Sequence, residues 1–231
     1  MREHLAAGDR ENSLRHPREA LVHYELALQT DPRNYAGLWK ASGDAIDLGE
    51  AETDAPKREA LYAKAMDYAR RAVAITPDGA EGHFNLARAL GRMALSLGPR
   101  DRVKYGTEVR AEALRTLELD PRHPGAMHVM GVWNAEVMRL NGITRLFAKT
   151  LLGGQILGKA SWAEAAQYME QSVTIDPDRA VHRLDLARVY RDTGRRSEAR
   201  AAYEAAAKAP FVDANDEMYK RAAADELRAL K

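Results

Sequence analysis

Apolar and small residues recur along the chain at intervals of three and four positions, within stretches that Gly and Pro separate. Such spacing places these positions on one face of an α-helix. We find no sustained alternation of apolar and polar residues of the kind that a half-buried β-strand shows. The pattern therefore predicts an all-α protein.

Five prolines reveal a repeat within these helices. Small, aromatic or apolar residues recur five, eight and twelve positions before each proline, and the last unit is shifted by one position. Small residues let two helices cross closely, and a proline ends the second helix because it cannot continue the hydrogen-bond ladder. The sets are Ala20, Tyr24, Ala27 before Pro32; Ala65, Ala69, Ala72 before Pro77; Val109, Ala113, Thr116 before Pro121; Ala165, Met169, Ser172 before Pro177; and Ala199, Tyr203, Ala206 before Pro210.

Each repeat unit is expected to be a pair of helices, and the first (A) helix has a regular pattern as the second (B) helix does. A small residue is expected at a fixed place in each A helix, and Ser42, Ala87, Gly131 and Ala187 occupy it. Gly49 and Gly194 are expected to end two A helices in a left-handed conformation. The pattern resembles the tetratricopeptide repeat (TPR), which implies an α-solenoid of antiparallel helix pairs.

The repeat predicts how the chain is organised. Successive prolines are 45, 44, 56 and 33 residues apart, so three units exceed a standard TPR and should have elongated helices or inserts. The largest surplus is expected to form a short apolar helix at 143–152, and the last helix to run from Asn215 to Leu230, with Asp213 or Asn215 as its start signal. We expect one domain, 1–231, with repeats at about 1–34, 35–79, 80–123, 124–179 and 180–212 and a capping helix at 213–231.

Composition excludes several kinds of chemistry. With 35 basic and 34 acidic residues the net charge is +1, which is not the basic excess of a nucleic-acid binder. The chain has no Cys, so disulfides, thiolate metal sites and cysteine nucleophiles are excluded. No apolar run is long enough to span a bilayer. We expect a soluble protein, cytoplasmic or, if a leader has been removed, periplasmic or exported.

Segments outside the plain repeat carry a more specific resemblance, clearest over 105–227. The segments are His123–Trp133, Ala148–Gly153, Ser161–Ala166 and the tail Phe211–Glu217. They resemble the family called regulator of microtubule dynamics, and the Ala- and Arg-rich composition favours a bacterial-type relative without the membrane anchor and coiled-coil leader of eukaryotic members.

Candidate catalytic and metal-binding motifs are weak. Gly153-x-x-x-x-Gly158-Lys159-Ala160 approaches a phosphate-binding loop, but Ala160 lacks the hydroxyl that would hold Mg²⁺ and no strand precedes it, so a linker is favoured. The seven His include no His-Glu-x-x-His. His123 and His128 would lie about 140° apart around a helix, which does not suit a shared metal. We expect no cofactor, no metal site and no enzymatic activity.

Binding of a partner is the class of function that remains, and the resemblance to the TPR indicates which residues would bind it. In TPR proteins the A helices line a concave wall, and an aromatic floor flanked by Arg and Asn suits an extended peptide or an acidic head group. The alternative that neighbouring long helices simply cover Trp39 and Phe84 stays open. A chaperone-type carboxylate clamp is not expected, because Trp39, Gly43, Gly125 and Val129 occupy its positions. The repeat phase assigns partner binding to Trp39, Lys40, Phe84, Asn85, Arg88, Arg92, His128, Val132, Glu136 and Arg188.

The fourth unit suggests a second function. An apolar helix carrying several Met residues is expected to face the insert at 143–152, either as core packing or as the wall of a site for a hydrophobic ligand such as a lipid. The main prediction is a non-enzymatic protein- or peptide-binding scaffold, and a carrier of an apolar ligand is the alternative. The apolar residues of this helix are Met127, Met130, Val132, Trp133 and Met138.

Overall fold

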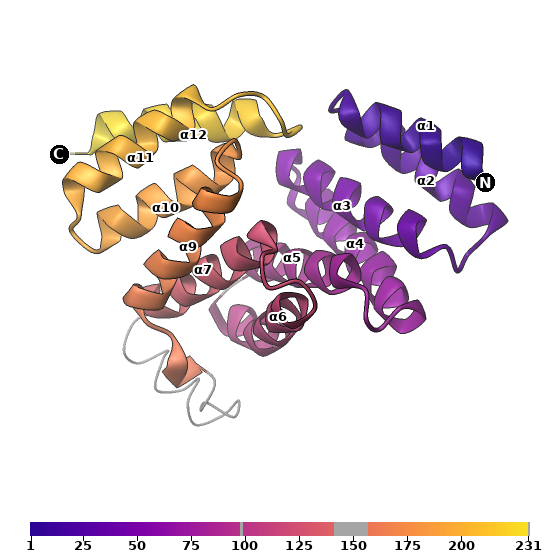
Figure 1. Ribbon diagram of the computed structural model, residues 1–231, viewed down its shortest axis with the longest axis horizontal. Helices are drawn as coiled ribbons and strands as arrows, with labels where there is room; N and C mark the ends of the chain where they lie inside the picture. The colour runs from indigo at the N-terminus through magenta and orange to yellow at the C-terminus, as the bar shows by residue number, and fades with distance from the viewer. Residues whose placement is uncertain (98, 141–156, 231) are drawn as a thin grey trace. The chain divides into compact units, whose positions relative to one another are not determined.

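The structure is a computed structural model that describes residues 1–97, 99–140 and 157–230. These residues form eleven α-helices and one 3₁₀ turn, and no strand occurs among them, which confirms the all-α prediction (Figure 1). The A helices are α1 (Arg2–Ser13), α3 (Tyr35–Ala51), α5 (Ala80–Ser96), α7 (Pro124–Arg139), α10 (Ala180–Asp192) and α12 (Asp216–Ala229). The B helices are α2 (Pro17–Thr30), α4 (Ala55–Ile75), α6 (Pro99–Leu119), α9 (Trp162–Ile175) and α11 (Arg196–Lys208), and η1 covers Leu157–Lys159.

The chain falls into two compact units, Met1–Pro121 and Arg122–Lys231, called unit 1 and unit 2 below. Each A helix packs against the B helix that follows it, α1 with α2, α3 with α4, α5 with α6, α7 with α9 and α10 with α11. Neighbouring A helices also touch within a unit, as α3 touches α5 and α10 touches α12. The helix pairs agree with the repeat, whereas a single domain with the repeat boundaries given above stays a prediction.

The prolines end the B helices as expected. Each B helix stops two residues before its proline, at Thr30, Ile75, Leu119, Ile175 and Lys208. The residue before a proline is disfavoured in the helical region, because the pyrrolidine ring would clash with it. Side-chain caps start helices α3, α4, α7 and α9: Asn34, Asp54, His123 and Ser161 each accept a hydrogen bond from the backbone N–H three residues later.

The helix-crossing positions form the core of both units. All fifteen B-helix residues that the repeat singles out are buried, and thirteen of them are at most 1% exposed. The small A-helix residues Ser42, Ala87, Gly131 and Ala187 are buried too. A Cβ atom on Gly131 would lie 2.7 Å from Cγ of Met169, so a larger residue at this crossing would force the Met169 side chain to move.

The two glycines expected to end A helices behave differently. Gly194 has a φ of +76° and follows α10, as predicted. Gly49 lies inside α3 and has no positive φ, so the prediction of a left-handed cap there was wrong. A Cβ atom at Gly49 would lie 2.5 Å from the ring of Tyr62 on α4, so the glycine is needed for close packing.

The last helix begins one residue later than expected, and of its two expected start residues Asp213 accepts a 3.2 Å hydrogen bond from the backbone N–H of Asn215. Asn215 makes no side-chain cap. Instead, a carboxylate oxygen of Asp216 accepts hydrogen bonds from the backbone N–H groups of Val212 (2.7 Å) and Asp213 (2.6 Å). The additional helix expected at 143–152 and the start of the linker after it lie outside the described residues.

Candidate partner-binding faces

The predicted residues of unit 1 lie on two neighbouring A helices, α3 and α5. On α3, the ammonium of Lys40 lies 5.4 Å from the centre of the Trp39 ring and pairs with Asp9 of α1 at 2.5 Å. Asp9 also accepts a 2.7 Å hydrogen bond from the hydroxyl of Tyr24. Burial acts to raise the pKa of Asp9, but the bonds from Lys40 and Tyr24 outweigh it and lower the pKa below its usual value.

The same arrangement recurs one repeat later. The guanidinium of Arg88 lies 5.7 Å from the centre of the Phe84 ring and donates a 2.8 Å hydrogen bond to Asp47 of α3. An aromatic ring, a cation above it and an acid on the preceding A helix thus form one module, which unit 1 contains twice. Arg92 of α5 also pairs with Glu50 of α3. The aromatic and charged residues of α3 and α5 named here are called the row below.

Asn85 stands apart from this row, because its side chain is used inside α5. The residue is 3% exposed, and its amide donates a 2.9 Å hydrogen bond to the carbonyl of Glu81 one turn earlier. Trp39 and Phe84 are partly exposed by comparison. The aromatic rings therefore offer a partner more surface than Asn85 does.

A buried carboxyl group at the edge of the row was not predicted. Asp44 of α3 is completely buried, and Oδ1 accepts a 2.6 Å hydrogen bond from the amide of Asn12 on α1. Its Oδ2 has no hydrogen-bond partner among the described residues. Burial, helped by the nearby charge of Asp47, raises the pKa of Asp44 to about 8. The available signal was the position of Asp44 between Ala41 and Ala45 on the apolar side of the helix.

The predicted residues of unit 2 lie on α7 and α10. Nε2 of His128 lies 2.8 Å from a carboxylate oxygen of Asp185, and its ring stacks on His182 with 4.5 Å between the ring centres. Val132 packs against the core cluster that includes Ala135 and Met169. His128 is 9% exposed, so packing leaves little of its side chain accessible to a partner.

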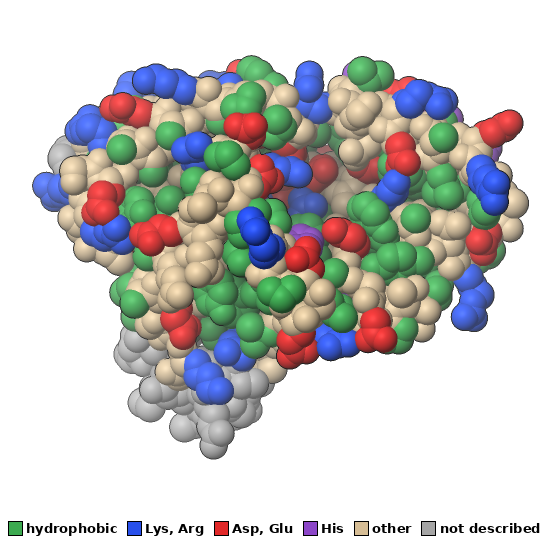
Figure 2. Space-filling model, in the orientation of Figure 1, with side chains coloured by type: hydrophobic (Ala, Val, Ile, Leu, Met, Phe, Trp, Pro, Cys, Tyr) green, Lys and Arg blue, Asp and Glu red, His purple; other side chains and the backbone are tan. Residues whose placement is uncertain are grey.

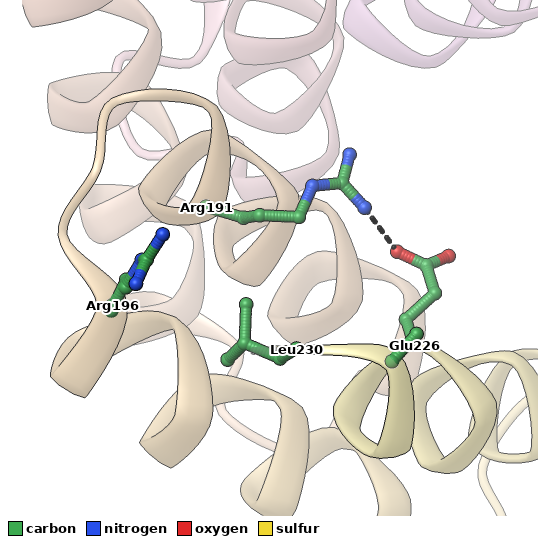
Figure 3. A pocket seen from close by; sticks show the side chains of 5 residues that line it. Arg191, Arg196, Glu226 and Leu230 are labelled. Carbon is green, nitrogen blue, oxygen red and sulfur yellow. Dashed lines mark hydrogen bonds and ion pairs between the residues drawn. The ribbon is translucent and has the colours of Figure 1, made fainter.

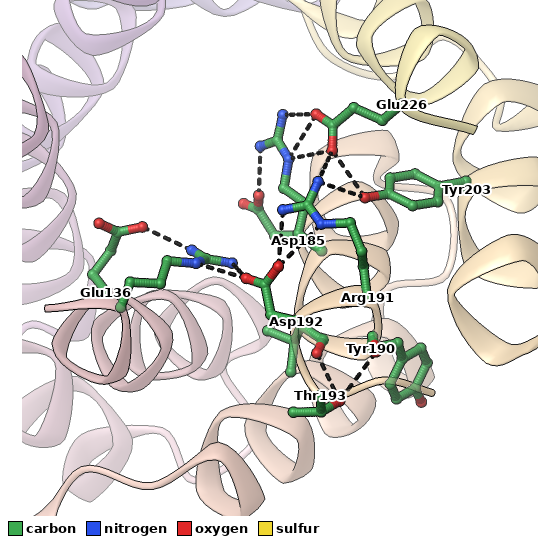
Figure 4. A network of polar contacts seen from close by, with 11 residues as sticks. Glu136, Asp185, Tyr190, Arg191, Asp192, Thr193, Tyr203 and Glu226 are labelled. Atoms are coloured by element: carbon green, nitrogen blue, oxygen red, sulfur yellow. Dashed lines mark hydrogen bonds and ion pairs between the residues drawn. The ribbon is translucent and has the colours of Figure 1, made fainter. Parts of the chain in front are cut away.

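Arg188 belongs to a polar network in unit 2 in which Figure 4 labels its partners Asp185 and Glu226. Its guanidinium donates to both carboxylate oxygens of Glu226 on α12, the shortest bond being 2.6 Å, and to Asp185 at 2.9 Å. Glu226 also accepts from the hydroxyl of Tyr203 (2.8 Å) and from Arg191 (2.9 Å). Burial acts to raise the pKa of Glu226, but the bonds from Arg188 outweigh it and lower the pKa.

Glu136 belongs to the same network through α7. It pairs with Arg139 at 2.7 Å, and Arg139 continues to Asp192 of α10 at 2.6 Å. Figure 4 shows these side chains directed toward one another from α7 and α10. Arg139 also lies 5.9 Å from the ring centre of Trp162.

These contacts revise the chemistry expected of the faces. Lys40, Arg88, Arg92 and Arg188 each pair with an acid on a neighbouring A helix. An incoming anion would have to displace an acid that is already in place, so the faces are balanced in charge rather than basic. Figure 2 shows acidic and basic side chains interspersed on the visible face of the molecule.

The remaining polar residues hold the helices together. The hydroxyl of Ser172 donates to the carbonyl of Pro124 and lies 3.0 Å from Nδ1 of His182. His83 lies between Glu112 and the carbonyl of Pro77.

Among the described residues, no three His, Asp or Glu side chains are grouped as a metal would require. None of the helices in this part of the chain has an apolar stretch that could span a bilayer.

The paired helices, with small residues at the crossings and prolines after the B helices, define a TPR-type α-solenoid protein. The model of the family "Regulator of microtubule dynamics protein 1-3" matches residues 5–231, so the chain belongs to this family.

Two curated relatives come from Mus musculus. Regulator of microtubule dynamics protein 3 is 26% identical over 188 residues, which cover 80% of this chain and 39% of the relative. Regulator of microtubule dynamics protein 1 is 21% identical over 157 residues, which cover 67% of this chain and 51% of the relative. The chain thus spans about half, or less, of the length of these relatives.

Solved structures show the same fold at low identity. The TPR protein TTC0263 of Thermus thermophilus has a TM-score of 0.68 and 21% identity, covering 96% of this chain and 98% of that one. Residues 41 to the end of MamA from Desulfovibrio magneticus RS-1 have a TM-score of 0.50 and 11% identity, covering 96% and 95%. These similarities support the α-solenoid fold class.

Proposed function

We propose that this chain is a non-enzymatic scaffold that binds a protein partner, through an extended peptide segment, on the A-helix faces. The observation that carries the proposal is the module found twice in unit 1, in which a partly exposed aromatic ring lies beneath a cation held by an acid. Trp39 and Phe84 are the anchors of this face, and Lys40, Arg88 and Arg92 surround them.

The geometry of neighbouring A helices suits an extended peptide. Packed helices lie about 8 to 10 Å apart, and an extended chain covers that distance in about three residues. Two peptide side chains three positions apart could therefore each contact one ring. Because the cations over the rings already have acidic partners, the side chains that fit best are apolar or aromatic, with polar backbone groups toward Lys40 and Arg88.

The acid in each module contributes by holding the cation in place. A fixed cation loses less conformational freedom on binding than a free side chain does, which favours association. In unit 2, Val132, Glu136 and Arg188 are the proposed contacts, while His128 and Asn85 support their helices from buried positions.

We propose neither microtubule regulation nor lipid transport for the chain. The first is a property named for relatives of which the chain spans about half or less. For the second, one expected wall, residues 143–152, lies outside the described residues, and Met127, Met130 and Trp133 on the other side are buried.

Peptides selected on the protein itself can test the proposal. A random-peptide phage library would be selected against the full chain, and the peptides obtained would be titrated by fluorescence anisotropy. Phe84→Ala and Trp39→Ala should each weaken binding by about tenfold or more, as expected for an aromatic side chain that a bound partner covers.

Val22→Ala provides a matched control, because Val22 is an exposed apolar residue, 51% accessible, on the B helix α2. Its affinity should equal that of the unmodified chain. Circular dichroism would verify that all variants are folded. Selected peptides that bind the Phe84 and Trp39 variants with unchanged affinity would contradict the proposed face.

A further inference from the structure

Unit 2 contains a pocket of about 310 Å³ beside the polar network, where α10, α11 and α12 meet (Figure 3). Arg191 is on α10, Arg196 begins α11, and Glu226, Ala229 and Leu230 belong to α12 and its C-terminal end. Its volume suits one or two side chains of a partner, not a large cofactor.

The two arginines of this pocket differ in their contacts. Arg191 pairs with Glu226 at 2.9 Å and with Asp192 at 3.0 Å, so its charge is already balanced. The guanidinium of Arg196 has no ion pair or hydrogen bond in the described parts of the chain, whereas its backbone N–H donates to the carbonyl of Gly194. The pocket therefore contains one cation whose donors are available to a ligand.

The other side of the pocket is apolar. Figure 3 shows the side chain of Leu230 below Arg191 and to the right of Arg196, with the guanidinium of Arg191 directed away toward Glu226. Ala229 and the aliphatic part of Arg191 extend this surface. A ligand that fits would place an anionic group on Arg196 and a small apolar group on Leu230.

We propose that this pocket binds a carboxylate together with the aliphatic side chain next to it in a partner peptide. Arg196 takes the carboxylate through paired N–H donors, and Leu230 and Ala229 take the aliphatic group. The inference rests on the proposed function, since it names a second anchor for a peptide partner, at a place that the A-helix residues predicted from the sequence do not include.

A phosphate group fits this pocket less well than a carboxylate. A dianion would gain a single unpaired guanidinium and would lie close to the carboxylate of Glu226, which lines the same pocket. One guanidinium matches the charge and the planar, two-oxygen geometry of one carboxylate.

Small compounds that carry only the two proposed groups can test the site. The full chain, labelled with ¹⁵N on arginine and with ¹³C on leucine methyls, would be titrated with N-acetyl-leucine and with N-acetyl-glutamyl-leucinamide. The first offers a terminal carboxylate and the second a side-chain carboxylate. Saturable shifts of the Arg196 Nε–H and Leu230 methyl signals with either compound are the expected result, and the tighter compound identifies the source of the carboxylate.

Two further compounds separate the carboxylate from the aliphatic group. N-acetyl-leucinamide lacks the carboxylate, and N-acetyl-glycine lacks the aliphatic side chain. Both should bind more weakly than N-acetyl-leucine. The proposal is overturned if N-acetyl-leucinamide or N-acetyl-glycine binds as tightly as the tighter of the two carboxylate compounds that carry leucine, or if no compound gives saturable shifts.

A pair of variants assigns the effect to one side chain. Arg196→Gln should weaken binding by about tenfold, the loss expected for a charge-assisted hydrogen bond. Arg200→Gln removes an exposed arginine of the same helix that does not line the pocket, and it should leave the affinity unchanged. Equal affinities for the two variants would overturn the proposal. Binding of the phage-selected peptides to the Phe84→Ala variant tests the unit 1 face, whereas the small compounds test this pocket. A failure of one proposal is therefore observed separately from a failure of the other.

Discussion

Arg88 of α5 donates a 2.8 Å hydrogen bond to Asp47 of α3 while its guanidinium lies 5.7 Å from the centre of the Phe84 ring. The pair connects two helices through residues that are 41 positions apart in sequence, and it holds the cation above the aromatic ring. Because both side chains are less than a quarter exposed, this ion pair is better shielded from water than a surface pair.

A double-mutant cycle can measure this contact. Arg88→Ala, Asp47→Ala and the double variant would be unfolded in urea next to the unmodified chain. The two single losses of unfolding free energy should together exceed the loss in the double variant by about 1 kcal/mol, since the pair is partly buried. Strictly additive losses would show that the two residues do not stabilise each other.

The buried carboxyl of Asp44 predicts a stability that falls as pH rises. Its pKa in the folded chain is about 8, against 3.8 for an ordinary Asp, so the folded state retains a proton that the unfolded state releases. The stabilising contribution is complete below about pH 4 and is lost as the pH rises to about 8. Asp44→Asn removes this dependence and keeps an acceptor for Asn12.

Urea unfolding of the Asp44→Asn variant and the unmodified chain at several pH values checks this linkage. The free energy of unfolding of the variant should rise relative to that of the unmodified chain as pH rises, by an amount on the order of 6 kcal/mol across the whole window. A constant difference at all pH values would mean that Asp44 ionises normally in the folded chain.

Glu226 predicts a pH dependence of the opposite sign. Arg188, Tyr203 and Arg191 lower its pKa, so its contribution is present above the ordinary value of 4.5 and is lost as pH falls through the lowered value. Glu226→Gln should cost about 1 to 3 kcal/mol at neutral pH, because it leaves Arg188 with a weaker acceptor. The cost should shrink in acid, which unfolding at pH values on both sides of 4.5 would reveal. A cost that grows in acid would contradict the assignment.

Two glycine substitutions separate close packing from helix propensity. Gly49→Ala places a methyl group 2.5 Å from the buried ring of Tyr62 and should destabilise the chain by about 1 to 3 kcal/mol. Gly91→Ala meets no atom within 4 Å, and it should stabilise α5 by about 0.5 to 1 kcal/mol. Thermal unfolding measures both. Equal effects would show that the contact with Tyr62 relaxes freely.

The fold was predictable from sequence because its determinants are local. The prolines after each B helix and the small residues before them follow a fixed spacing, and each such residue is buried where the repeat places it. Gly49 shows the limit of local rules. Near a helix end a glycine predicts a left-handed cap, but the ring of Tyr62, 13 positions away in sequence, explains why it is needed.

The candidate faces were predictable only in part. The repeat phase identified Trp39, Phe84 and Arg88 as neighbours on adjoining A helices, and the structure places them so. It did not identify Asp9, Asp47 or Glu226 as the acids that neutralise the cations, because these pairs join residues 31 to 41 positions apart. Many Arg and Glu residues satisfy helical spacing equally well, so spacing alone selects no partner.

The helices, their pairing and the small residues of the core follow from the sequence alone, since these depend on backbone conformation and on burial patterns that repeat along the chain. Only the three-dimensional arrangement shows which charges meet, that Asp44 is buried, and that Arg196 lines a pocket together with Leu230. These features depend on the distances between residues far apart in the chain. Electrostatic interactions and pKa values change steeply with distance and burial. Helical periodicity specifies neither the distance between two charges on separate helices nor how deeply they are buried.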